Sequence, residues 1–411
     1  MADATTLGAT VTPIDGGITA PLGFTSASLH CGIKAKSGAL DLTVVAAAQP
    51  VAAAGLFTTN LAQAAPVLLS KKHLQQTSGL ARAIVINSGC ANACTGTQGF
   101  ADAETMARET ARALGCAVEQ VLVASTGVIG VNLQMDKVAP GIGTAVAQLA
   151  RGKGSEVARA IMTTDPFPKE AAVRVDTAAG SFSIGGTAKG SGMIEPNMAT
   201  MIGLLTTDAQ VSPALLRRAL EESARDTFNA ITVDGECSTN DTLFALASGG
   251  SGVAIDEASY AALLEGLLRV SRRLAVDIVR GGEGATKLIR VTVQDARSGD
   301  AARQVARTIA NSPLVKTAVH GADPNWGRIV AAAGRSGVMF DINRTSVHVG
   351  GVRLFENGLP HDAAAPRAAK HMKGSEVDIQ VHLGTGGGAE ATIWTCDLSA
   401  EYVRINGEYR T

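Results

Sequence analysis

The sequence predicts a protein of the α/β class with a mixed sheet, and three observations support this prediction. Hydrophobic residues make up 46% of the 411 residues, but aromatic residues only 3%, and 46 residues are glycine. Short apolar runs of strand length alternate with longer segments that have a helical pattern. A chain of this length suggests two or three domains. The composition argues against a fibrous, disordered or disulfide-stapled protein.

The charge balance favours a small-molecule partner. Lys and Arg number 36 against 37 Asp and Glu, so no net basic field exists to attract nucleic acid or a membrane surface. Residues 1–17 lack the basic and apolar regions of a signal peptide, and no apolar run is long enough to span a membrane. We therefore expect a cytoplasmic protein.

Cysteine and histidine spacing gives little support for a metal or a disulfide framework. The six cysteines are scattered, and only Cys90 and Cys94 are near neighbours, so small buried thiols are the expected interpretation over zinc. None of the seven histidines lies within a hundred residues of Thr200, and none forms an HExxH pattern. We expect no metal and no resident cofactor.

The first half of the chain alternates strands and helices. The predicted strands are residues 39–47, 51–57, 83–86, 120–124, 171–176 and 181–186, the last two as a hairpin. The predicted helices are residues 101–114, 137–149 and 156–162. The segment 87–96 is predicted to be a polar loop. The strand at 120–124 is predicted to end in a turn that contains Thr126 and Gly127, where backbone N–H groups could bind an oxyanion, although most such turns are structural.

The centre of the chain is residues 189–208, in which Gly190, Gly192 and Pro196 precede an apolar run at 201–205. The pattern predicts a turn followed by a buried strand, with Thr200 at the strand entrance. That place suits a nucleophile. By pattern alone, however, a structural threonine at the edge of a strand is the more common case.

The second half begins with a well-marked helix, for which Ser212 is the predicted N-cap and Pro213 the first residue. The acidic residues Asp234, Glu236 and Asp241 suggest a cation site or, more often, a hydrogen-bonded turn. Glu283 lies between glycines, where it could reach a ligand or stay in solvent. Further predicted elements are helices at 259–279 and 302–310, a strand at 288–293 and a strand-rich region at 346–395. Trp326 is expected to pack.

The chain resembles the ornithine acetyltransferase (glutamate N-acetyltransferase) family of arginine biosynthesis. The resemblance rests on Asn197-Met198-Ala199-Thr200-Met201 and on the DPNWGR block at 323–328, and it extends from residue 32 to the end of the chain. It implies a four-layer α/β/β/α sandwich of the N-terminal-nucleophile type. It also implies self-cleavage between Ala199 and Thr200 into intertwined fragments 1–199 and 200–411, with two copies of each fragment in the assembly.

The resemblance implies a chemistry in which Thr200 carries acetyl from N-acetylornithine to glutamate by a ping-pong mechanism. The new α-amine of Thr200 would act as base, since its ordinary pKa of about 7.7–8.0 is close to working pH. Thr126 and Gly127 would form the oxyanion hole. Acetyl-CoA is possible as a second acetyl donor.

The resemblance also implies a set of substrate-binding residues, and it leaves two rival functions open. The implied substrate-binding residues are Thr163, Thr164, Lys189, Thr200, Glu283, Asn406 and Thr411. Glu195 stands where many members carry histidine, which could alter the rate of self-cleavage. The rivals are an N-terminal-nucleophile aminopeptidase or amidohydrolase of the same fold and an unprocessed binding protein.

Overall fold

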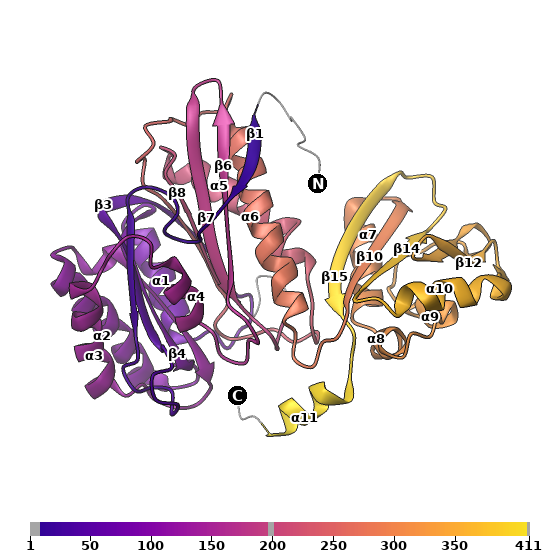
Figure 1. Ribbon diagram of the computed structural model, residues 1–411, viewed down its shortest axis with the longest axis horizontal. Helices are drawn as coiled ribbons and strands as arrows, with labels where there is room; N and C mark the ends of the chain where they lie inside the picture. The colour runs from indigo at the N-terminus through magenta and orange to yellow at the C-terminus, as the bar shows by residue number, and fades with distance from the viewer. Residues whose placement is uncertain (1–8, 196–200, 409–411) are drawn as a thin grey trace. The chain divides into compact units, whose positions relative to one another are not determined.

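The computed structural model describes residues 9–195 and 201–408. These residues form two compact units, which Figure 1 shows in the context of the whole chain. Unit 1 comprises residues up to 229 together with 236–278, and unit 2 comprises 230–235 together with 279–408. Each unit contains its own sheet and its own helices and is described by itself.

Unit 1 is built on one mixed sheet, which has nine strands among the described residues. The strands run in the order β1-β6-β7-β8-β9-β3-β4-β5, and β2 also pairs with β3. The pairs β4–β5 and β8–β9 are parallel and the others antiparallel, so the predicted α/β class with a mixed sheet is confirmed. The bounds are β1 (Thr10–Ile14), β2 (Phe24–Leu29), β3 (Leu42–Phe57), β4 (Leu80–Cys90), β5 (Val121–Val128), β6 (Lys169–Thr177), β7 (Gly180–Lys189), β8 (Ile202–Thr207) and β9 (Thr242–Ala247).

The sheet folds back on itself through β3. The first half of β3 pairs with β2 and its second half with β9, and the register to β4 slips between Ala46 and Val51. The exposed Pro50 lies in that irregularity, where a residue without an N–H group is tolerated. As a result β7 and β5, which are far apart in the strand order, meet at their ends: Lys189 Nζ lies 3.4 Å from Thr126 Oγ1.

Side chains alternate between the two faces of the sheet in unit 1 and so contribute to two separate hydrophobic clusters. In β5, Leu122 and Ala124 join an inner core that also contains Ile202 and Phe244 of the facing half of the sheet. Val123 points the other way and packs with residues of α2 and α3. On the other half of the sheet, Gly186 and Gly266 allow α6 to lie close against β7. Unit 1 is therefore an α/β/β/α sandwich, as expected.

Helix α5 of unit 1 begins where its capping residue predicts. Ser212 accepts a hydrogen bond from the Leu215 N–H at 3.3 Å and Pro213 opens α5, which confirms the predicted N-cap. The last residues of α6 fall in unit 2. The bounds are α1 (Ala65–Gln76), α2 (Gly96–Leu114), α3 (Met135–Ala147), α4 (Gly154–Ala160), α5 (Pro213–Arg225) and α6 (Tyr260–Arg280).

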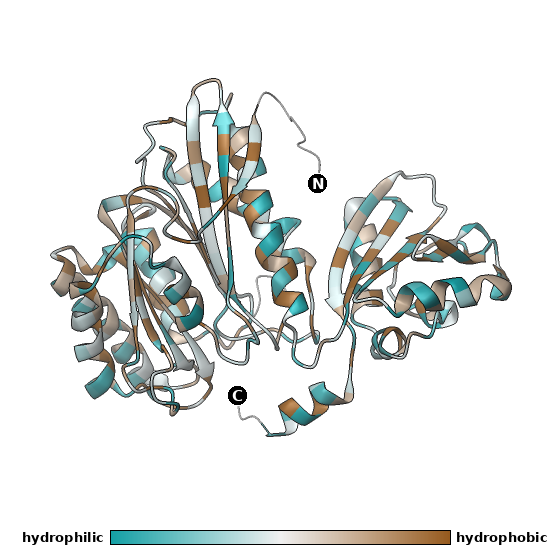
Figure 2. Ribbon diagram, in the orientation of Figure 1, coloured by the Kyte–Doolittle hydropathy of each residue, from teal (hydrophilic) through white to brown (hydrophobic). Residues whose placement is uncertain are grey.

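Unit 2 has a smaller mixed sheet, with the strand order β13-β12-β11-β14-β10-β15 among the described residues. Burial alternates along β14 and β15, and Figure 2 shows the corresponding bands of hydropathy on these strands. Trp326 stacks on Phe355 with ring centroids 4.9 Å apart, so it packs as expected. The bounds are β10 (Leu288–Ala296), β11 (Ser346–Val349), β12 (Val352–Glu356), β13 (Leu359–Pro360), β14 (Glu376–His382), β15 (Ala389–Cys396), α7 (Gly299–Ala310), α8 (Pro313–His320), α9 (Trp326–Gly334), α10 (Ala365–Met372) and α11 (Ala400–Glu408).

Several predicted strands and one predicted loop were wrong in their bounds. The runs at 39–47 and 51–57 form one strand, because the bulge in β3 does not end it. The predicted loop at 87–96 starts too early, since β4 continues to Cys90. The strand at 120–124 does not stop at Ser125 but continues through Thr126 and Gly127 to Val128, because β4 supplies a parallel partner there.

The predicted cleavage point lies inside the sequence of unit 1. Strands β1 to β7 precede it and β8 and β9 follow it, yet all belong to one sheet. The Ala199–Thr200 bond itself lies outside the described residues, so the cleavage stays a prediction. Within the part of the chain that the structure describes, no helix combines the length and the apolar character needed to cross a membrane.

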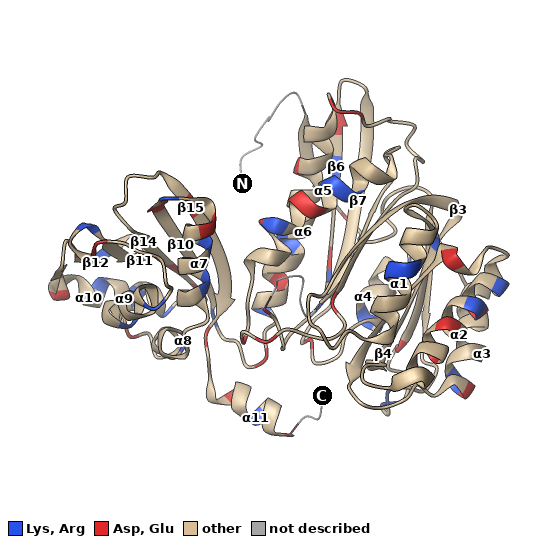
Figure 3. Cartoon of the chain, turned by 180° about the vertical axis from the view of Figure 1, so that it is seen from behind, with Lys and Arg blue, Asp and Glu red and all other residues tan. Residues whose placement is uncertain are grey.

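Basic and acidic residues are interspersed along the helices of each unit, as Figure 3 shows. Several of them form pairs one helical turn apart, such as Arg217 with Glu221 in α5 at 2.8 Å and Arg269 with Glu265 in α6 at 2.7 Å. The balanced net charge that the sequence shows is therefore also a local balance on these helices.

Candidate active site

The candidate site of unit 1 lies at the ends of adjacent strands. Lys189 is the last residue of β7 and pairs with Ile202, the first residue of β8. Ile202 in turn pairs with Thr242 at the start of β9, directly after Asp241. Strand register therefore brings Lys189 and Asp241 to either side of the segment that enters β8.

Thr126 and Gly127 approach this place from β5. Thr126 is buried and its Oγ1 lies 3.4 Å from Lys189 Nζ. Gly127 has a φ of +129°, and a Cβ atom on it would lie 2.3 Å from the carbonyl carbon of Gly89. Only glycine fits there, because β4 and β5 approach closely and the backbone is in a region that other residues avoid. The structure thus brings Thr126, Gly127 and Lys189 together.

Asn240 links the two halves of the folded sheet beside the site. Its Nδ2 donates to the carbonyls of Ala91 at 2.6 Å and Ser125 at 2.9 Å, and its Oδ1 accepts from Thr239 Oγ1 at 2.6 Å. The side chain is buried, and these bonds satisfy its amide. Asn240 therefore holds the strand end that carries Thr126 against the start of β9.

Asp165 is a buried carboxylate near Lys189. One carboxylate oxygen accepts from Lys169 Nζ at 2.6 Å and from the Gly190 N–H at 2.7 Å, and the other accepts from the Thr163 N–H at 3.0 Å. Burial alone would raise the pKa of Asp165, but Lys189, Lys169 and these hydrogen bonds outweigh it, so the pKa lies below its ordinary value. Asp165 is therefore an ionised carboxylate that joins the Thr163 loop to the end of β7.

Asp241 has the opposite character although it is close to the same lysine. Its carboxyl is buried, and one oxygen has no hydrogen-bond partner among the described residues. Desolvation raises the pKa of Asp241 well above its ordinary value, and Lys189, the Met201 N–H and Thr58 only partly oppose this. The expected hydrogen-bonded turn is present, since Ser238 Oγ accepts from the Asn240 N–H at 3.1 Å.

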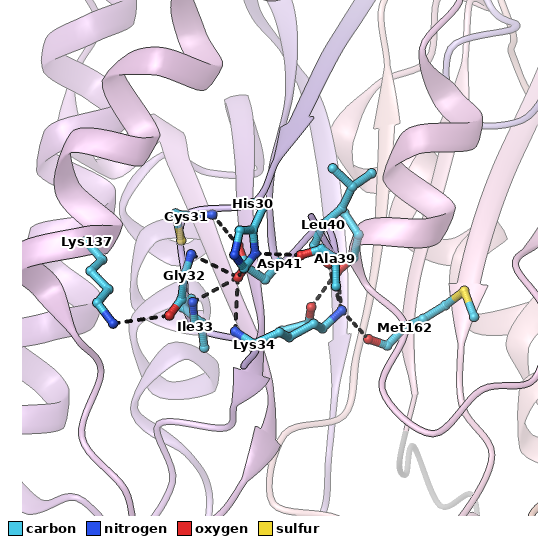
Figure 4. A network of polar contacts seen from close by, with 12 residues as sticks. His30, Cys31, Gly32, Ile33, Lys34, Ala39, Leu40, Asp41, Lys137 and Met162 are labelled. Carbon is cyan, nitrogen blue, oxygen red and sulfur yellow. Dashed lines mark hydrogen bonds and ion pairs between the residues drawn. The ribbon is translucent and has the colours of Figure 1, made fainter. Parts of the chain in front are cut away.

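Thr163 and Thr164 lie half-buried in the loop between α4 and β6. The network in Figure 4 holds the segment before them. Asp41 accepts N–H groups from Cys31, Gly32, Ile33 and Lys34 at 2.6 to 3.1 Å, and Lys34 Nζ donates to the carbonyls of Leu40 and Met162, each at 2.8 Å. The loop at 31–41 thus fixes the chain one residue before Thr163.

Glu283 and Asn406 meet in unit 2. Glu283 is buried, and its Oε2 accepts from Asn406 Nδ2 at 2.9 Å, so the interpretation as a solvated turn residue was wrong. Gly284, next in sequence, has no room for a side chain because Tyr402 N and Ser399 Oγ lie within 3 Å of its Cβ position. The close approach docks α11, which carries Asn406, against Glu283.

Three of the predicted site residues lie outside the described part of the chain. These are Ala199, Thr200 and Thr411. Their predicted roles in cleavage, nucleophilic attack and substrate binding stay predictions. Glu195 is half-buried and makes contacts of its own near the start of this gap.

Sequence reasoning missed Asp165, Lys169 and Asn240 as members of the site. A charged residue before proline at Asp165-Pro166, in a loop between predicted elements, was the available signal. No signal of this kind marks Asn240, because its partners are 149 and 115 residues away in sequence. All six cysteines are unbridged, and the described residues include no group of three or more potential metal ligands.

Comparison with known proteins is consistent across nearly the whole chain. The model of the ArgJ family matches residues 25–411. A protein of Symbiobacterium thermophilum named arginine biosynthesis bifunctional protein ArgJ is 48% identical over 400 residues, which cover 96% of this chain and 99% of that protein. A protein of the same name from Dehalococcoides mccartyi is also 48% identical, over 97% of this chain and 98% of its own length.

Among solved structures, that of the Bacillus halodurans arginine biosynthesis bifunctional protein ArgJ is 38% identical. It covers 50% of this chain and 97% of that chain, with a TM-score of 0.48.

Replacing Gly127 with alanine should destabilise the protein by about 2 kcal/mol or more, because it adds both a clash with Gly89 and an unfavourable φ. The matched control is Gly130→Ala, which has a positive φ of +79° but no atom near its Cβ position, and should cost only about 1 kcal/mol. Urea unfolding of both variants measures the difference. Equal losses would show that β4 and β5 are not in close contact at Gly127.

The buried aspartates Asp241 and Asp41 are expected to have opposite effects on the pH dependence of stability. The folded pKa of Asp241 is raised, so its contribution to stability is present below the unfolded pKa of about 3.9 and is lost as pH rises through the folded pKa. In the unsubstituted chain, Asp241 should therefore lower the free energy of unfolding as pH rises from 4 to 8, by at most about 1.4 kcal/mol per pH unit. Asp241→Asn should abolish this decrease.

The reverse applies to Asp41, whose folded pKa is lowered because backbone N–H groups and His30 outweigh the effect of burial. Its contribution is present above the unfolded pKa and is lost as pH falls. Asp41→Asn should destabilise the protein at pH 7, and the difference from the unsubstituted chain should shrink below pH 4. Unfolding measured across pH for both variants tests the pair, and parallel curves for all three proteins would contradict the assignment.

Proposed function

Because this chain belongs to the ArgJ family, we propose that it transfers the acetyl group of N-acetylornithine to glutamate through an acetyl ester on Thr200. The observation that carries the proposal is the family match over residues 25–411, together with relatives named for arginine biosynthesis that match over nearly their whole length. The described part of the site supports it with donors and charges suited to acyl transfer.

In the proposed maturation, Thr200 Oγ attacks the carbonyl of Ala199 and the resulting ester is hydrolysed. This leaves fragments 1–199 and 200–411 and a free α-amine on Thr200. The strand pairing of β8 with β7 and β9 supports fragments that stay together, since backbone hydrogen bonds join them across the break. We propose an assembly of two copies of each fragment in the cytoplasm.

In the proposed first half-reaction, the α-amine of Thr200 takes the proton from Oγ, which attacks the acetyl carbonyl of N-acetylornithine. Thr126 and the backbone of Gly127 bind the oxyanion that forms, and the nearby Lys189 adds a positive field. The C–N bond then breaks, and the Thr200 ammonium returns its proton to the departing amine of ornithine. The products are ornithine and acetyl-Thr200.

In the second half-reaction, the α-amine of glutamate attacks the ester. Oγ leaves as the proton of the amine passes back through the Thr200 amine, and N-acetylglutamate departs. The proton that Thr200 gives up to ornithine in the first half-reaction is replaced by one from the glutamate amine in the second, so the cycle restores Thr200 without a cofactor. The word bifunctional in the names of the relatives supports a second reaction, in which acetyl-CoA supplies the acetyl group to the same threonine.

Substrate recognition needs a fixed cation for a carboxylate and a fixed anion for an amine. We assign these roles to the buried Lys189 and Glu283, and the remaining contacts to Thr163, Thr164, Asn406 and Thr411. The rigidity of the described members supports the assignment: Asp165 holds the Thr163 N–H, and Asn406 holds the Glu283 carboxylate. Preorganised charges of this kind favour binding because little conformational entropy is lost.

Transfer and hydrolysis can be separated by one assay. Ornithine release from N-acetylornithine should depend on glutamate and should yield one N-acetylglutamate for each ornithine. Thr200→Ala should lower this rate by about three orders of magnitude or more, because it removes the nucleophile. Release of ornithine and acetate at the same rate without glutamate would instead identify an amidohydrolase.

Glu283→Gln tests the assigned anion. Loss of a charged hydrogen bond to the substrate amine, worth roughly 1.5–3 kcal/mol, should raise the KM for N-acetylornithine at least about tenfold, with a smaller change in kcat. Glu401→Gln is the matched control, since Glu401 is an exposed residue on α11 paired with Arg404, and it should leave KM unchanged. A rise of less than about twofold for Glu283→Gln would exclude the assigned role.

A further inference from the structure

A pocket lined by basic side chains lies in unit 2, formed by β11, β12 and the start of α10. It has a volume of about 340 Å³, and its lining includes four side chains that are or can become cations: His348, Arg353, His361 and Arg367. Gly351, Val352 and Ala364 complete the lining. None of these residues has a part in the proposed acetyl transfer.

The cations of this pocket are incompletely neutralised. Arg353 Nη1 donates to Glu356 at 2.8 Å, and its Nε lies 3.4 Å from His348 Nε2. The side chains of Arg367 and His361 have no hydrogen bond or ion pair within the described ranges 9–195 and 201–408. The nearest further carboxylate in sequence, Asp362, accepts from Trp326 Nε1 at 3.3 Å. Among the residues that the structure describes, Arg367 is therefore a positive charge without a partner at the pocket lining.

Neighbouring basic side chains add to the effect of burial on His348. Burial lowers the pKa of His348, and so do the neighbouring His382, whose ring centroid is 5.8 Å away, and Arg353; Glu356 opposes them only in part. In addition, His348 Nδ1 is buried and has no partner among the described residues. A bound anion would offset the repulsion between His348, His382 and Arg353.

The start of α10 brings Arg367 to the pocket. Ala364 is the N-cap of α10 and lines the pocket, and Arg367 lies in the first turn of the helix. The N–H groups of Ala364 and Ala365 already donate to the carbonyls of His361 and Asp362, and Pro366 has no N–H group. The helix start therefore adds only the positive end of its dipole, and the guanidinium groups and imidazoles supply the donors.

We propose that the pocket of His348, Arg353, His361 and Arg367 binds a dianionic phosphoryl group, either as free phosphate or as part of a small metabolite. A guanidinium group offers paired N–H donors that match a tetrahedral oxyanion, and an imidazole ring can donate an N–H group to a further oxygen. A monocarboxylate would satisfy fewer of these donors. The site is separate from the residues assigned to acetyl transfer.

The test follows the histidine ring signals of the full chain by NMR at pH 7 and constant ionic strength, with inorganic phosphate and ADP as separate probes. Signals of His348 and His361, assigned by His→Gln substitution, should shift in a saturable way. Arg367→Gln should weaken binding at least tenfold. Arg335→Gln, which removes an exposed arginine elsewhere in unit 2, should not change it. Both variants should keep the acetyl-transfer rate and the unfolding midpoint of the unsubstituted chain.

Saturable binding of inorganic phosphate would identify free phosphate as sufficient, whereas binding of ADP alone would require the phosphoryl group to be carried on a larger molecule. The proposal is overturned if neither probe gives a saturable shift, or if Arg367→Gln and Arg335→Gln weaken binding equally. Because acetyl transfer is measured on the same samples, failure of this proposal would be distinct from failure of the proposed enzyme activity.

Discussion

The hydrogen bonds on both sides of β8 are the constraint on which the candidate site depends. This strand starts two residues after Thr200 and is bonded to β7 on one side and to β9 on the other. Its register fixes Lys189 and Asp241 beside the strand entrance. It also means that a break after residue 199 would leave the new chain end attached to the centre of a sheet. A nucleophile there would be positioned by backbone pairing before any side-chain contact is made.

The second feature of the site is that two carboxyl groups near Lys189 have pKa values shifted in opposite directions. Asp165 and Asp241 are both buried, but Lys189, Lys169 and backbone N–H groups lower the pKa of Asp165, whereas desolvation raises the pKa of Asp241. Environments that push two carboxyl pKa values apart are typical of catalytic sites. Here Lys189 lies near one carboxyl whose pKa is lowered and one whose pKa is raised.

Local features of the fold could be predicted from the sequence, and long-range ones could not. The β6–β7 hairpin, the apolar strand after Thr200 and the Ser212 cap follow from patterns within a few residues. The continuation of β5 through Gly127 depends on β4, and the fold-back of the sheet depends on a bulge in β3 that resembles an ordinary loop. Glu283 looked like a solvent-exposed turn residue, because its partner Asn406 is 123 residues away.

The roles of the site residues came from resemblance and not from local pattern. A threonine before an apolar strand is common, and only membership in the family distinguishes Thr200 from a structural residue. In the proposed mechanism this chain cuts itself, which makes that threonine a nucleophile with its own base. The intact mass of freshly purified, active protein, with sequencing of its chain ends, tests this cleavage. Two species are expected, one of which begins at Thr200; a single full-length species with undiminished acetyl transfer would contradict self-cleavage as the source of the catalytic base.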